Sequence, residues 1–435
     1  MSTALPAPAP GLWSGVRTAL ALDEPARPRA VPTSIVQRRR RGYDPSGDDG
    51  RAQVELVRDD EGVLRWVYTP PQTRISAGRR AYRSIHVAPR SIVEQFRFNE
   101  LGRNEVTGKL VDLDAWLTPG QGMKRWHEGA FVDEPHPAVD EGRVLLLVHG
   151  TFSQSQMWAD ELQATAAGKE LLNQWQDRYE RILAFNHPTL SVGAWSNAID
   201  LHRALQAVRV PIDIVCHSRG GLVVSWLLRL EAVPVERVVF VGSPLVGTSL
   251  AAPDKLRAAL DLLANYADAV SVVGQGVTPV FPLAAGVAGL AKILGKALRL
   301  GSGLPIPDAA IALVPGLATQ QAVGNNLDLR QLFADQWLCQ PQMSGIGVSF
   351  QPDESKEPLW KFWKRFTHLG AQLKYAAADL VFPGPNDLVV DVDSMFRLGE
   401  AANIAFDDLG VSPTTHHTNY FRDERVVDLL ATRLR

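Results

Sequence analysis

The feature that most constrains the fold is residues 212–224, which read Ile-Asp-Ile-Val-Cys-His-Ser-Arg-Gly-Gly-Leu-Val-Val. An apolar run leads into a serine that is soon followed by two glycines, and residues 222–230 have a helix-forming composition. This order predicts a strand, a sharp turn and a helix, with the Ser218 hydroxyl exposed at the end of a sheet. Gly220 and Gly221 allow the helix to start close against the strand, where a Cβ would collide. A buried strand followed by a glycine-rich loop with an incidental serine is the alternative.

Other apolar runs predict further strands of the same kind. Residues 144–148, Val-Leu-Leu-Leu-Val, show no polar alternation, which is typical of a strand covered on both faces in a parallel sheet. Stretches with apolar residues at helical spacing separate the runs, and this alternation favours an α/β fold with a doubly wound, mostly parallel sheet. The predicted strands are 144–148, 181–185, 212–215, 238–241, 344–350 and a short one that ends at residue 382; the predicted helices are 158–176, 197–208, 222–230, 359–373 and a final one that includes 426–430.

Composition narrows the classes of function. The 435 residues include 45 basic and 47 acidic side chains, and the net charge of −2 gives no reason to expect nucleic acid or an anionic membrane as the main partner. One of the two cysteines, Cys216 and Cys339, lies in the predicted turn, so we expect no structural disulfide and a reducing, cytoplasmic environment. Residues 1–10 lack the basic start and apolar core of a secretion signal. No run of about 20 residues is free of charge and proline, so we expect no membrane span.

The chain is expected to divide into a tail, an extension and a main domain. Residues 1–51 are rich in Pro, Ala, Ser and Arg, and such a composition buries too little surface to offset the entropy of ordering, so we expect a disordered tail. Its four arginines at 38–41 are interpreted as solvated, with RNA or lipid contact as the alternative. Residues 52–142, with a hairpin predicted over 53–68, are expected to pack on the main domain as an N-terminal extension. The main domain is expected to span residues 143–435.

The alternation of strands and helices stops at about residues 250–343, an apolar stretch rich in Ala, Leu and Gly that prolines interrupt. Within it, residues 283–300 favour a helix with Lys292, Lys296 and Arg299 on one face. In an enzyme, such an insertion is typical of a helical lid over the site. A basic amphipathic helix that lies on a lipid surface is the alternative. We prefer the lid, because several glycines weaken an independent helix.

Four short motifs follow one another along the main domain. His-Gly-Thr-Phe occupies 149–152, Cys-His-Ser-Arg-Gly-Gly occupies 216–221, Asn-Asp-Leu-Val-Val occupies 386–390 and His-Thr-Asn-Tyr-Phe occupies 417–421. In this ordered combination, residues 143–435 resemble the α/β-hydrolases of the lipase and esterase kind, in particular little-characterised bacterial members with the same turn. Cys216 takes the place of the first glycine of their G-x-S-x-G nucleophile elbow. The resemblance implies the α/β-hydrolase fold, with a mostly parallel doubly wound sheet and a helical lid insertion. The expected N-terminal extension before residue 143 lies outside the resemblance.

The resemblance also implies a catalytic triad. A serine hydroxyl is a poor nucleophile unless a base removes its proton, and a carboxylate keeps a histidine base in the right tautomer. In this fold the order along the chain is Ser, then Asp, then His. Ser218, Asp387 and His417 follow that order, each after a predicted strand. Asp391 is a reserve for the acid, and His416 is expected to be a neighbour of the base.

Other positions receive roles by the same resemblance. The backbone N–H groups of Thr151 and Arg219 are implied to form the oxyanion hole, with Phe152 as a second candidate for the first of them. Three further residues are candidates for substrate contact: His149, His217 and Leu245. For His149, a structural histidine beneath its loop is the alternative.

The implied activity is hydrolysis of a carboxylic ester, or of another acyl bond, through an acyl-serine intermediate. No cofactor is expected, and the partner is a small-molecule or lipid-like acyl ester rather than nucleic acid. A metal site at His416 and His417 lacks the accompanying HExxH or Cys/His spacing, so none is expected. Two alternatives stay open. One is a catalytically silent binding or effector module on the same scaffold, and the other is a phospholipase that contacts membranes or micelles through the lid.

Overall fold

The computed structural model describes residues 52–58, 64–69, 91–98, 103–230, 233–251, 289–290, 314–321, 326–334, 337, 340–351, 384–398 and 402–435. The predicted tail at 1–51, the helix at 359–373, the strand ending at residue 382 and most of the predicted lid at 250–343 lie outside these ranges. Of the helix predicted over 283–300, residues 289 and 290 are described, and both are helical. Among the described helices, none is long and apolar enough to cross a bilayer.

Two sheets are present in the described ranges. The smaller has three antiparallel strands in the order β2-β1-β3, formed by β1 (Ala52–Arg58), β2 (Leu64–Thr69) and β3 (Ser91–Phe98). Pairing of β1 with β2 confirms the hairpin predicted over 53–68.

The larger sheet has eight strands in the order β11-β10-β9-β8-β6-β7-β4-β5. Strands β6 to β11 run parallel, whereas β4 pairs antiparallel with both β7 and β5. This is the mostly parallel sheet that the sequence predicts. Its strands are β4 (Gly122–His127), β5 (Ala130–Asp133), β6 (Val144–Val148), β7 (Arg181–Asn186), β8 (Ile212–His217), β9 (Val235–Val241), β10 (Gln342–Phe350) and β11 (Ala405–Ser412).

Strands β4 and β5 precede residue 143, so the sheet begins within the segment that we expected to be a separate extension. They are short and lie at one end of the sheet, with β5 as the edge strand. Only part of β4 is buried and β5 is half-buried to exposed, so neither shows the long apolar run of a central strand. Edge strand β11 was not predicted for the same reason, because its side chains are mostly exposed or half-buried.

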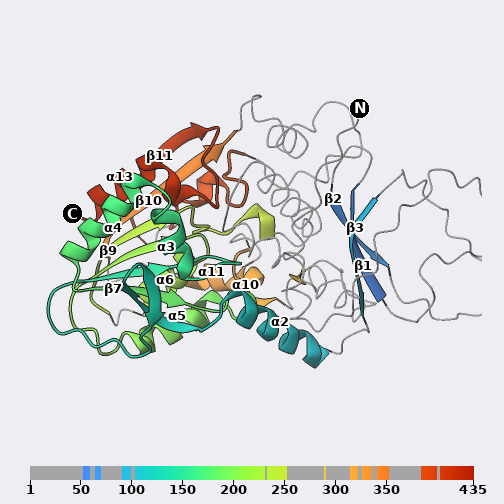
Figure 1. Ribbon diagram of the computed structural model, residues 1–435, viewed down its shortest axis with the longest axis horizontal. Coiled ribbons are helices and arrows are strands. Elements are labelled where there is room, and N and C mark those ends of the chain that lie inside the picture. The colour runs from blue at the N-terminus through green and yellow to red at the C-terminus, as the bar shows by residue number, and fades with distance from the viewer. Residues whose placement is uncertain are drawn as a thin grey trace, which may run out of the picture.

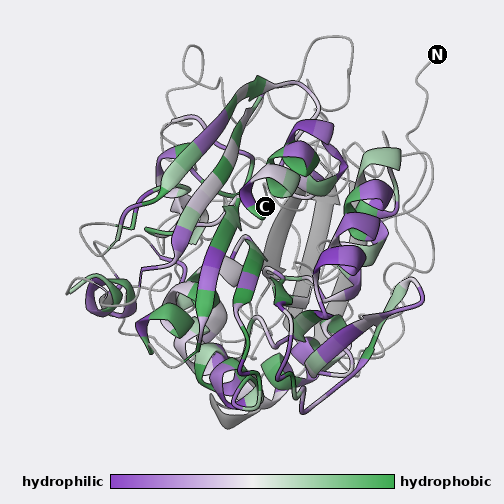
Figure 2. Cartoon of the chain, turned by 90° about the vertical axis from the view of Figure 1, so that its left-hand side faces the viewer, coloured by the Kyte–Doolittle hydropathy of each residue, from purple (hydrophilic) through white to green (hydrophobic). Residues whose placement is uncertain are grey.

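Helices cover both faces of the large sheet (Figure 1). On one face, α3 (Gln156–Leu162), α4 (Ala166–Arg178) and α13 (Glu424–Arg433) pack over the side chains of Leu145 and Leu147. On the other, α5 (Ala194–Ala204), α6 (Gly220–Arg229) and α11 (Leu327–Leu332) pack over Leu146 and Val148. Figure 2 shows hydrophobic and hydrophilic residues side by side on the helices that flank the sheet, as expected for helices with one buried face.

The remaining described elements are α2 (Arg103–Leu117), α10 (Pro315–Ala318) and the short 3₁₀ helices η1 (Ser249–Ala251), η5 (Val392–Ser394) and η6 (Tyr420–Arg422).

The helix predicted over 158–176 is wrong as a single element, because the chain breaks it into α3 and α4. Thr165 is the N-cap of α4, and its hydroxyl accepts a hydrogen bond from the Gly168 N–H at 3.0 Å. Gly168 also packs so closely on α3 that a Cβ would lie 2.1 Å from the Leu162 carbonyl oxygen. A capping residue and a close backbone approach therefore end one helix and start the next.

The order of strands and helices positions the site. Parallel strands β6, β8, β10 and β11 all end at the same edge of the sheet, and the loops that follow them carry the four motifs. Ligand sites in open α/β sheets form outside this edge.

Candidate active site

Ser218 lies in a strained turn between β8 and α6. Its φ is +54°, in the left-handed region that residues other than glycine seldom adopt. The Ser218 N–H donates to the Val241 carbonyl at 3.0 Å, which ties the turn to the end of β9. Space for the turn depends on Gly220, where a Cβ would lie 2.4 Å from the Val148 carbonyl oxygen. The predicted strand, turn and helix are thus present.

Cys216, which replaces the first glycine of the family pattern, is accommodated within β8. Its fully buried side chain lies on a strand between Val148 and Phe240, with the sulfur 3.6 Å from the Val239 carbonyl oxygen. Burial raises the pKa of the Cys216 thiol well above its usual range, so the side chain packs as a neutral group. The residue that must be small beside Ser218 is Gly150, where a Cβ would lie 2.5 Å from the Ser218 Cβ.

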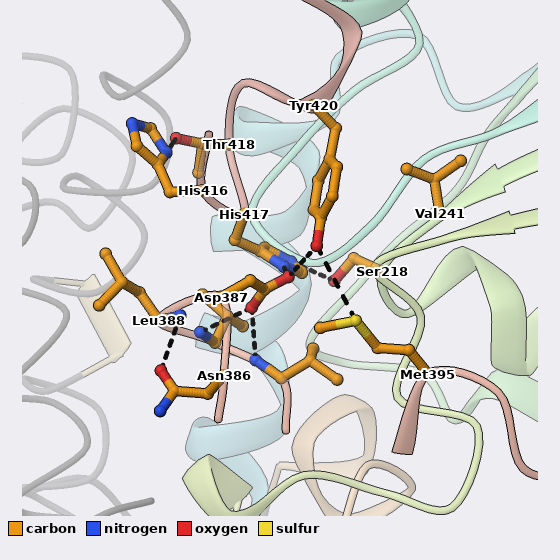
Figure 3. A network of polar contacts seen from close by, with 12 residues as sticks. Ser218, Val241, Asn386, Asp387, Leu388, Met395, His416, His417, Thr418 and Tyr420 are labelled. Atoms are coloured by element: carbon orange, nitrogen blue, oxygen red, sulfur yellow. Dashed lines mark hydrogen bonds and ion pairs between the residues drawn. The ribbon is translucent and has the colours of Figure 1, made fainter. Parts of the chain in front are cut away.

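The structure brings Ser218, Asp387 and His417 into one chain of hydrogen bonds (Figure 3). His417 Nδ1 lies 2.8 Å from Asp387 Oδ2, and His417 Nε2 lies 2.8 Å from Ser218 Oγ. A carboxylate only accepts hydrogen bonds, so Nδ1 carries the proton and Nε2 is left to accept from the serine hydroxyl. Ser218 is 4% exposed and Asp387 is fully buried, so the chain is sheltered from bulk water.

Both oxygens of Asp387 are held by donors. Oδ1 accepts the backbone N–H groups of Val389 at 3.0 Å and Val390 at 2.8 Å. Oδ2 accepts the Tyr420 hydroxyl at 2.9 Å in addition to His417 (Figure 3). Burial, and then the Asp387 charge, hold the pKa of Tyr420 well above its ordinary value, so the phenol keeps its proton and donates. Sequence reasoning gave Tyr420 no role, although it stands within the quoted motif at 417–421.

The expected neighbour His416 and the reserve acid Asp391 lie beside the chain of hydrogen bonds and do not join it. The His416 ring contacts the Thr418 hydroxyl at 3.3 Å and the Phe350 ring, and Figure 3 shows it directed away from Ser218. Asp391 accepts the Ser249 N–H at 3.0 Å.

His217 supports the backbone of His417. Its Nε2 lies 2.9 Å from the His417 carbonyl oxygen, and the two rings lie 4.8 Å apart. Burial, and then the neighbouring His417, lower the pKa of His217 well below its usual value, so the ring is neutral and donates through Nε2–H. The side chain thereby fixes the loop after β11. Its predicted contact with substrate stays a prediction.

His149 fixes one peptide group in the loop after β6. Its Nδ1 donates to the Gly150 carbonyl at 2.9 Å, and its Nε2 accepts the His187 N–H at 3.1 Å. Burial lowers the pKa of His149 to about 4, which keeps the ring neutral and suits both bonds. In a trans peptide the N–H points opposite to the carbonyl, so the Thr151 N–H is turned away from this ring. The contacts agree with the structural alternative for His149.

The two predicted donors in this loop differ. The Phe152 N–H already donates to Thr189 Oγ1 at 3.3 Å. The Thr151 N–H and the Arg219 N–H have no acceptor among the described residues, so both are available to a ligand. The Thr151 hydroxyl pairs with the Gln320 side chain, a contact across 169 residues that the sequence did not predict.

Arg219 and Leu245 are buried. The Arg219 guanidinium donates to the Val192 carbonyl at 2.6 Å, and burial lowers its pKa to about 10, which leaves it charged at neutral pH. Leu245 packs in the apolar cluster that contains Leu222 and Phe240, and its predicted contact with substrate stays a prediction.

Within the described ranges, no group of three or more His, Cys, Asp or Glu side chains is arranged to hold a metal ion.

The topology is that of the α/β-hydrolase fold, as the sequence predicts. Six parallel strands with helices on both faces carry a serine in a strand–turn–helix, and an aspartate and a histidine follow later strands in that order.

Comparison with known proteins gave the following findings. The model of a family described as "Domain of unknown function (DUF7379)" matches residues 117–435. No curated protein matches the sequence. Lipase BlEst2 of Bacillus licheniformis, in its mature form, is similar at 16% identity over 71% of this chain and 99% of its own, with a TM-score of 0.31. Lipase 1 of Pelosinus fermentans is similar at 14% identity over 68% and 99%, with a TM-score of 0.38. Carboxylesterase CesB of Bacillus subtilis is similar at 13% identity over 77% and 99%, with a TM-score of 0.34.

Proposed function

We propose that this chain, which belongs to the family described as "Domain of unknown function (DUF7379)", is a serine hydrolase that cleaves a carboxylic ester through an acyl-serine intermediate. The observation that carries the proposal is the pair of 2.8 Å contacts that join Asp387 to His417 and His417 to Ser218. Such a chain activates a hydroxyl that is otherwise a poor nucleophile.

In the proposed first half-reaction, Ser218 Oγ attacks the ester carbonyl carbon while its proton passes to His417 Nε2. Asp387 accepts from Nδ1–H throughout, so the imidazolium that forms faces a carboxylate. The carbonyl oxygen becomes an oxyanion. The N–H groups of Thr151 and Arg219, which have no acceptor in the described part of the chain, are suited to bind it. Collapse of the tetrahedral intermediate expels the alcohol, which takes the proton from His417.

In the second half-reaction, a water molecule replaces the alcohol. His417 removes its proton as the oxygen attacks the acyl-serine carbonyl, and the same two N–H groups receive the second oxyanion. Release of the carboxylic acid returns the proton to Ser218. These steps consume only ester and water, so the proposal includes neither a cofactor nor a metal.

We propose a small-molecule or lipid-like acyl ester as the substrate and a lid formed by residues 250–343. The two alternatives from the sequence predict different results. A silent binding module would not react at Ser218. A phospholipase that works on membrane surfaces would be more active on micelles than on the same ester as monomers.

The test is turnover of p-nitrophenyl esters of increasing acyl length, together with labelling by a fluorophosphonate probe. We expect labelling of the wild type, and we expect Ser218→Ala to abolish labelling and to lower kcat/KM by about 10⁴-fold or more. Thr151→Ala is the matched comparison. It keeps the backbone N–H, so its loss should be smaller than the 10²–10³ or so that removal of an oxyanion donor causes. Turnover that survives Ser218→Ala, or a wild type that the probe does not label, would reject the proposal.

A further inference from the structure

A buried carboxylate on α2 holds the loop that follows β7. Asp114 is 1% exposed, and its oxygens accept three consecutive backbone N–H groups: Thr189 at 2.8 Å, Leu190 at 3.0 Å and Ser191 at 2.6 Å. The Ser191 hydroxyl adds a bond of 2.5 Å. Asp114 lies before residue 117, where the match to the family model begins. An element outside that match therefore holds a loop within it.

The Thr189 hydroxyl links Asp114 to the proposed oxyanion loop. Thr189 Oγ1 lies 3.4 Å from Asp114 Oδ1, and because a carboxylate only accepts, the hydroxyl is the donor in this contact. With its proton directed to Asp114, the oxygen turns a lone pair toward the Phe152 N–H, which donates to it at 3.3 Å. Thr189 is fully buried, so water does not compete for either bond.

The backbone that these bonds hold is strained. Phe152 has a φ of +56°, which costs a residue with a side chain about 1 kcal/mol or more relative to a relaxed conformation. Without an acceptor for its N–H, the peptide between Thr151 and Phe152 could rotate and relieve that strain. The Thr151 N–H belongs to the preceding peptide, whose Gly150 carbonyl accepts His149 Nδ1–H. The contacts of His149 and Thr189 therefore hold the two peptides that meet at the Thr151 Cα, and loss of the Thr189 contact would loosen the position of the Thr151 N–H.

The same loop reaches the second donor. Val192, directly after the segment that Asp114 binds, accepts the Arg219 guanidinium at 2.6 Å. Burial lowers the pKa of Arg219, and the Asp114 charge opposes that shift. The Asp114 carboxylate thus binds the N–H groups of this loop, and the Arg219 guanidinium binds its Val192 carbonyl. Arg219 is also one of the two residues whose backbone N–H is proposed to bind the oxyanion.

We propose that Asp114 is a positioning residue for the oxyanion hole and acts through the Thr189 hydroxyl on the backbone of Thr151 and Phe152. This inference rests on the proposed function of Ser218. It gives α2, which lies outside the family match except for its last residue, a part in the reaction that a purely structural N-terminal extension would not have.

The test compares two pairs of variants in the full chain. Asp114→Asn removes the charge, and Asp112→Asn on the exposed side of the same helix is its control. Thr189→Val removes the hydroxyl, and Thr189→Ser restores it. Loss of a whole oxyanion donor costs on the order of 10²–10³ in rate, so we expect Asp114→Asn and Thr189→Val to lower kcat by about 10- to 100-fold. KM should change little, and Asp112→Asn and Thr189→Ser should behave as the wild type.

Affinity for a trifluoromethyl ketone supplies a second readout, because its adduct with serine carries an oxyanion. Inhibition should weaken by the same factor as kcat. In the double variant of Asp114→Asn and Thr189→Val, the loss should be close to that of the worse single variant, since residues that act in series are not additive.

The inference is overturned if Thr189→Val keeps the wild-type kcat, or if its loss appears only in KM or in the midpoint of thermal unfolding. Should Asp114→Asn fail to fold, the comparison of Thr189→Val with Thr189→Ser decides. Fluorophosphonate labelling of the wild type is measured first. Without it the proposed function fails, whereas labelling together with fully active variants contradicts only the role of Asp114.

Discussion

At the scale of single residues, the site is built from buried polar groups whose partners come from distant parts of the chain. Among the described residues, Asp387 has four donors, and Tyr420 and His417 are the two that are side chains. Burial makes such bonds valuable, because a buried charged group that loses a partner is not compensated by water.

Replacing Tyr420 by Phe should slow catalysis without disturbing substrate binding. The ring stays, but Asp387 loses one donor, and its hold on His417 weakens. We expect kcat to fall by about 10-fold, equivalent to about 1.4 kcal/mol, with KM near the wild-type value. Tyr179→Phe is the matched control, because it removes a bond of the same length, 2.9 Å, to the buried Asp213 at the other end of β8. Equal kcat losses in both variants would contradict this account.

Glu161 should make stability depend on pH. This α3 residue is 1% exposed, and Arg422 donates to its Oε2 at 3.1 Å. Burial raises the pKa of Glu161 from 4.5 to about 7, and the Arg422 charge offsets only part of that rise. The folded state therefore holds a proton more tightly than the unfolded state does. The resulting stabilisation is complete below the unfolded value of 4.5 and is lost as the pH rises through about 7.

Chemical denaturation at several pH values measures this effect. The free energy of unfolding of the wild type should fall across that window, and Glu161→Gln should remove most of this decline. Glu424→Gln changes an exposed glutamate on α13 and should keep the wild-type profile. A Glu161→Gln profile as steep as that of the wild type would exclude Glu161 as the cause.

At the scale of elements, continuous apolar runs made the central strands predictable. Strands β6 to β10 lie close to the predicted ranges, and β6, with five apolar residues in a row, shows the hydrophobic sequence that burial on both faces favours. Edge strands β5 and β11, and β4 next to β5, were not predicted, because β5 is only four residues long and all three are mostly half-buried or exposed and lack a continuous apolar run. The break between α3 and α4 was missed because it depends on a close backbone contact at Gly168.

The cysteine in the elbow should contribute to stability and not to chemistry. Cys216 fills a fully buried position in β8, and Gly150 already provides the space that Ser218 needs. We expect Cys216→Gly, which introduces the first glycine of the G-x-S-x-G pattern, to lower the free energy of unfolding by about 2 kcal/mol through lost packing and a freer unfolded chain. Its kcat should match that of the wild type in the folded fraction. A large fall in kcat with unchanged stability would mean that the thiol acts in the reaction.

At the scale of the whole molecule, the proposed active site and a buried ionic network lie at opposite ends of β8. Ser218 follows the carboxyl end of β8, whereas the fully buried Asp213 lies at its start. Asp213 accepts Arg143 at 3.0 Å, Arg237 at 3.3 Å and the Tyr179 hydroxyl at 2.9 Å, so the amino ends of three parallel strands and the end of α4 meet at one carboxylate.

Asp213→Asn should destabilise the fold and spare the site. Loss of one partner from a buried ionic network costs about 3 kcal/mol, because the remaining charges are left without compensation. Denaturant midpoints should therefore fall, while kcat and KM measured well below the unfolding transition stay at wild-type values. A change in kcat would show that the two ends of the strand are coupled.

The candidate site was predictable only where it is local in sequence. Ser218, Asp387 and His417 each stand in a recognisable motif at a strand end, and the structure brings them together. Asp114 carries no local signal, because the backbone groups that it binds lie 75 to 77 residues further along the chain. Gln320 meets Thr151 across a still longer separation, which only the folded chain defines.

The left-handed backbone at residue 218 has a consequence for how the chain can evolve. Ser218→Ala and Ser218→Gly both lack a hydroxyl, but only glycine adopts a φ of +54° without steric cost. Calorimetry should find the glycine variant more stable than the alanine variant by about 1 kcal/mol. Relatives that have lost activity and kept the fold should therefore tend to carry glycine at this position. A glycine there would mark a relative in which the hydroxyl is no longer under selection.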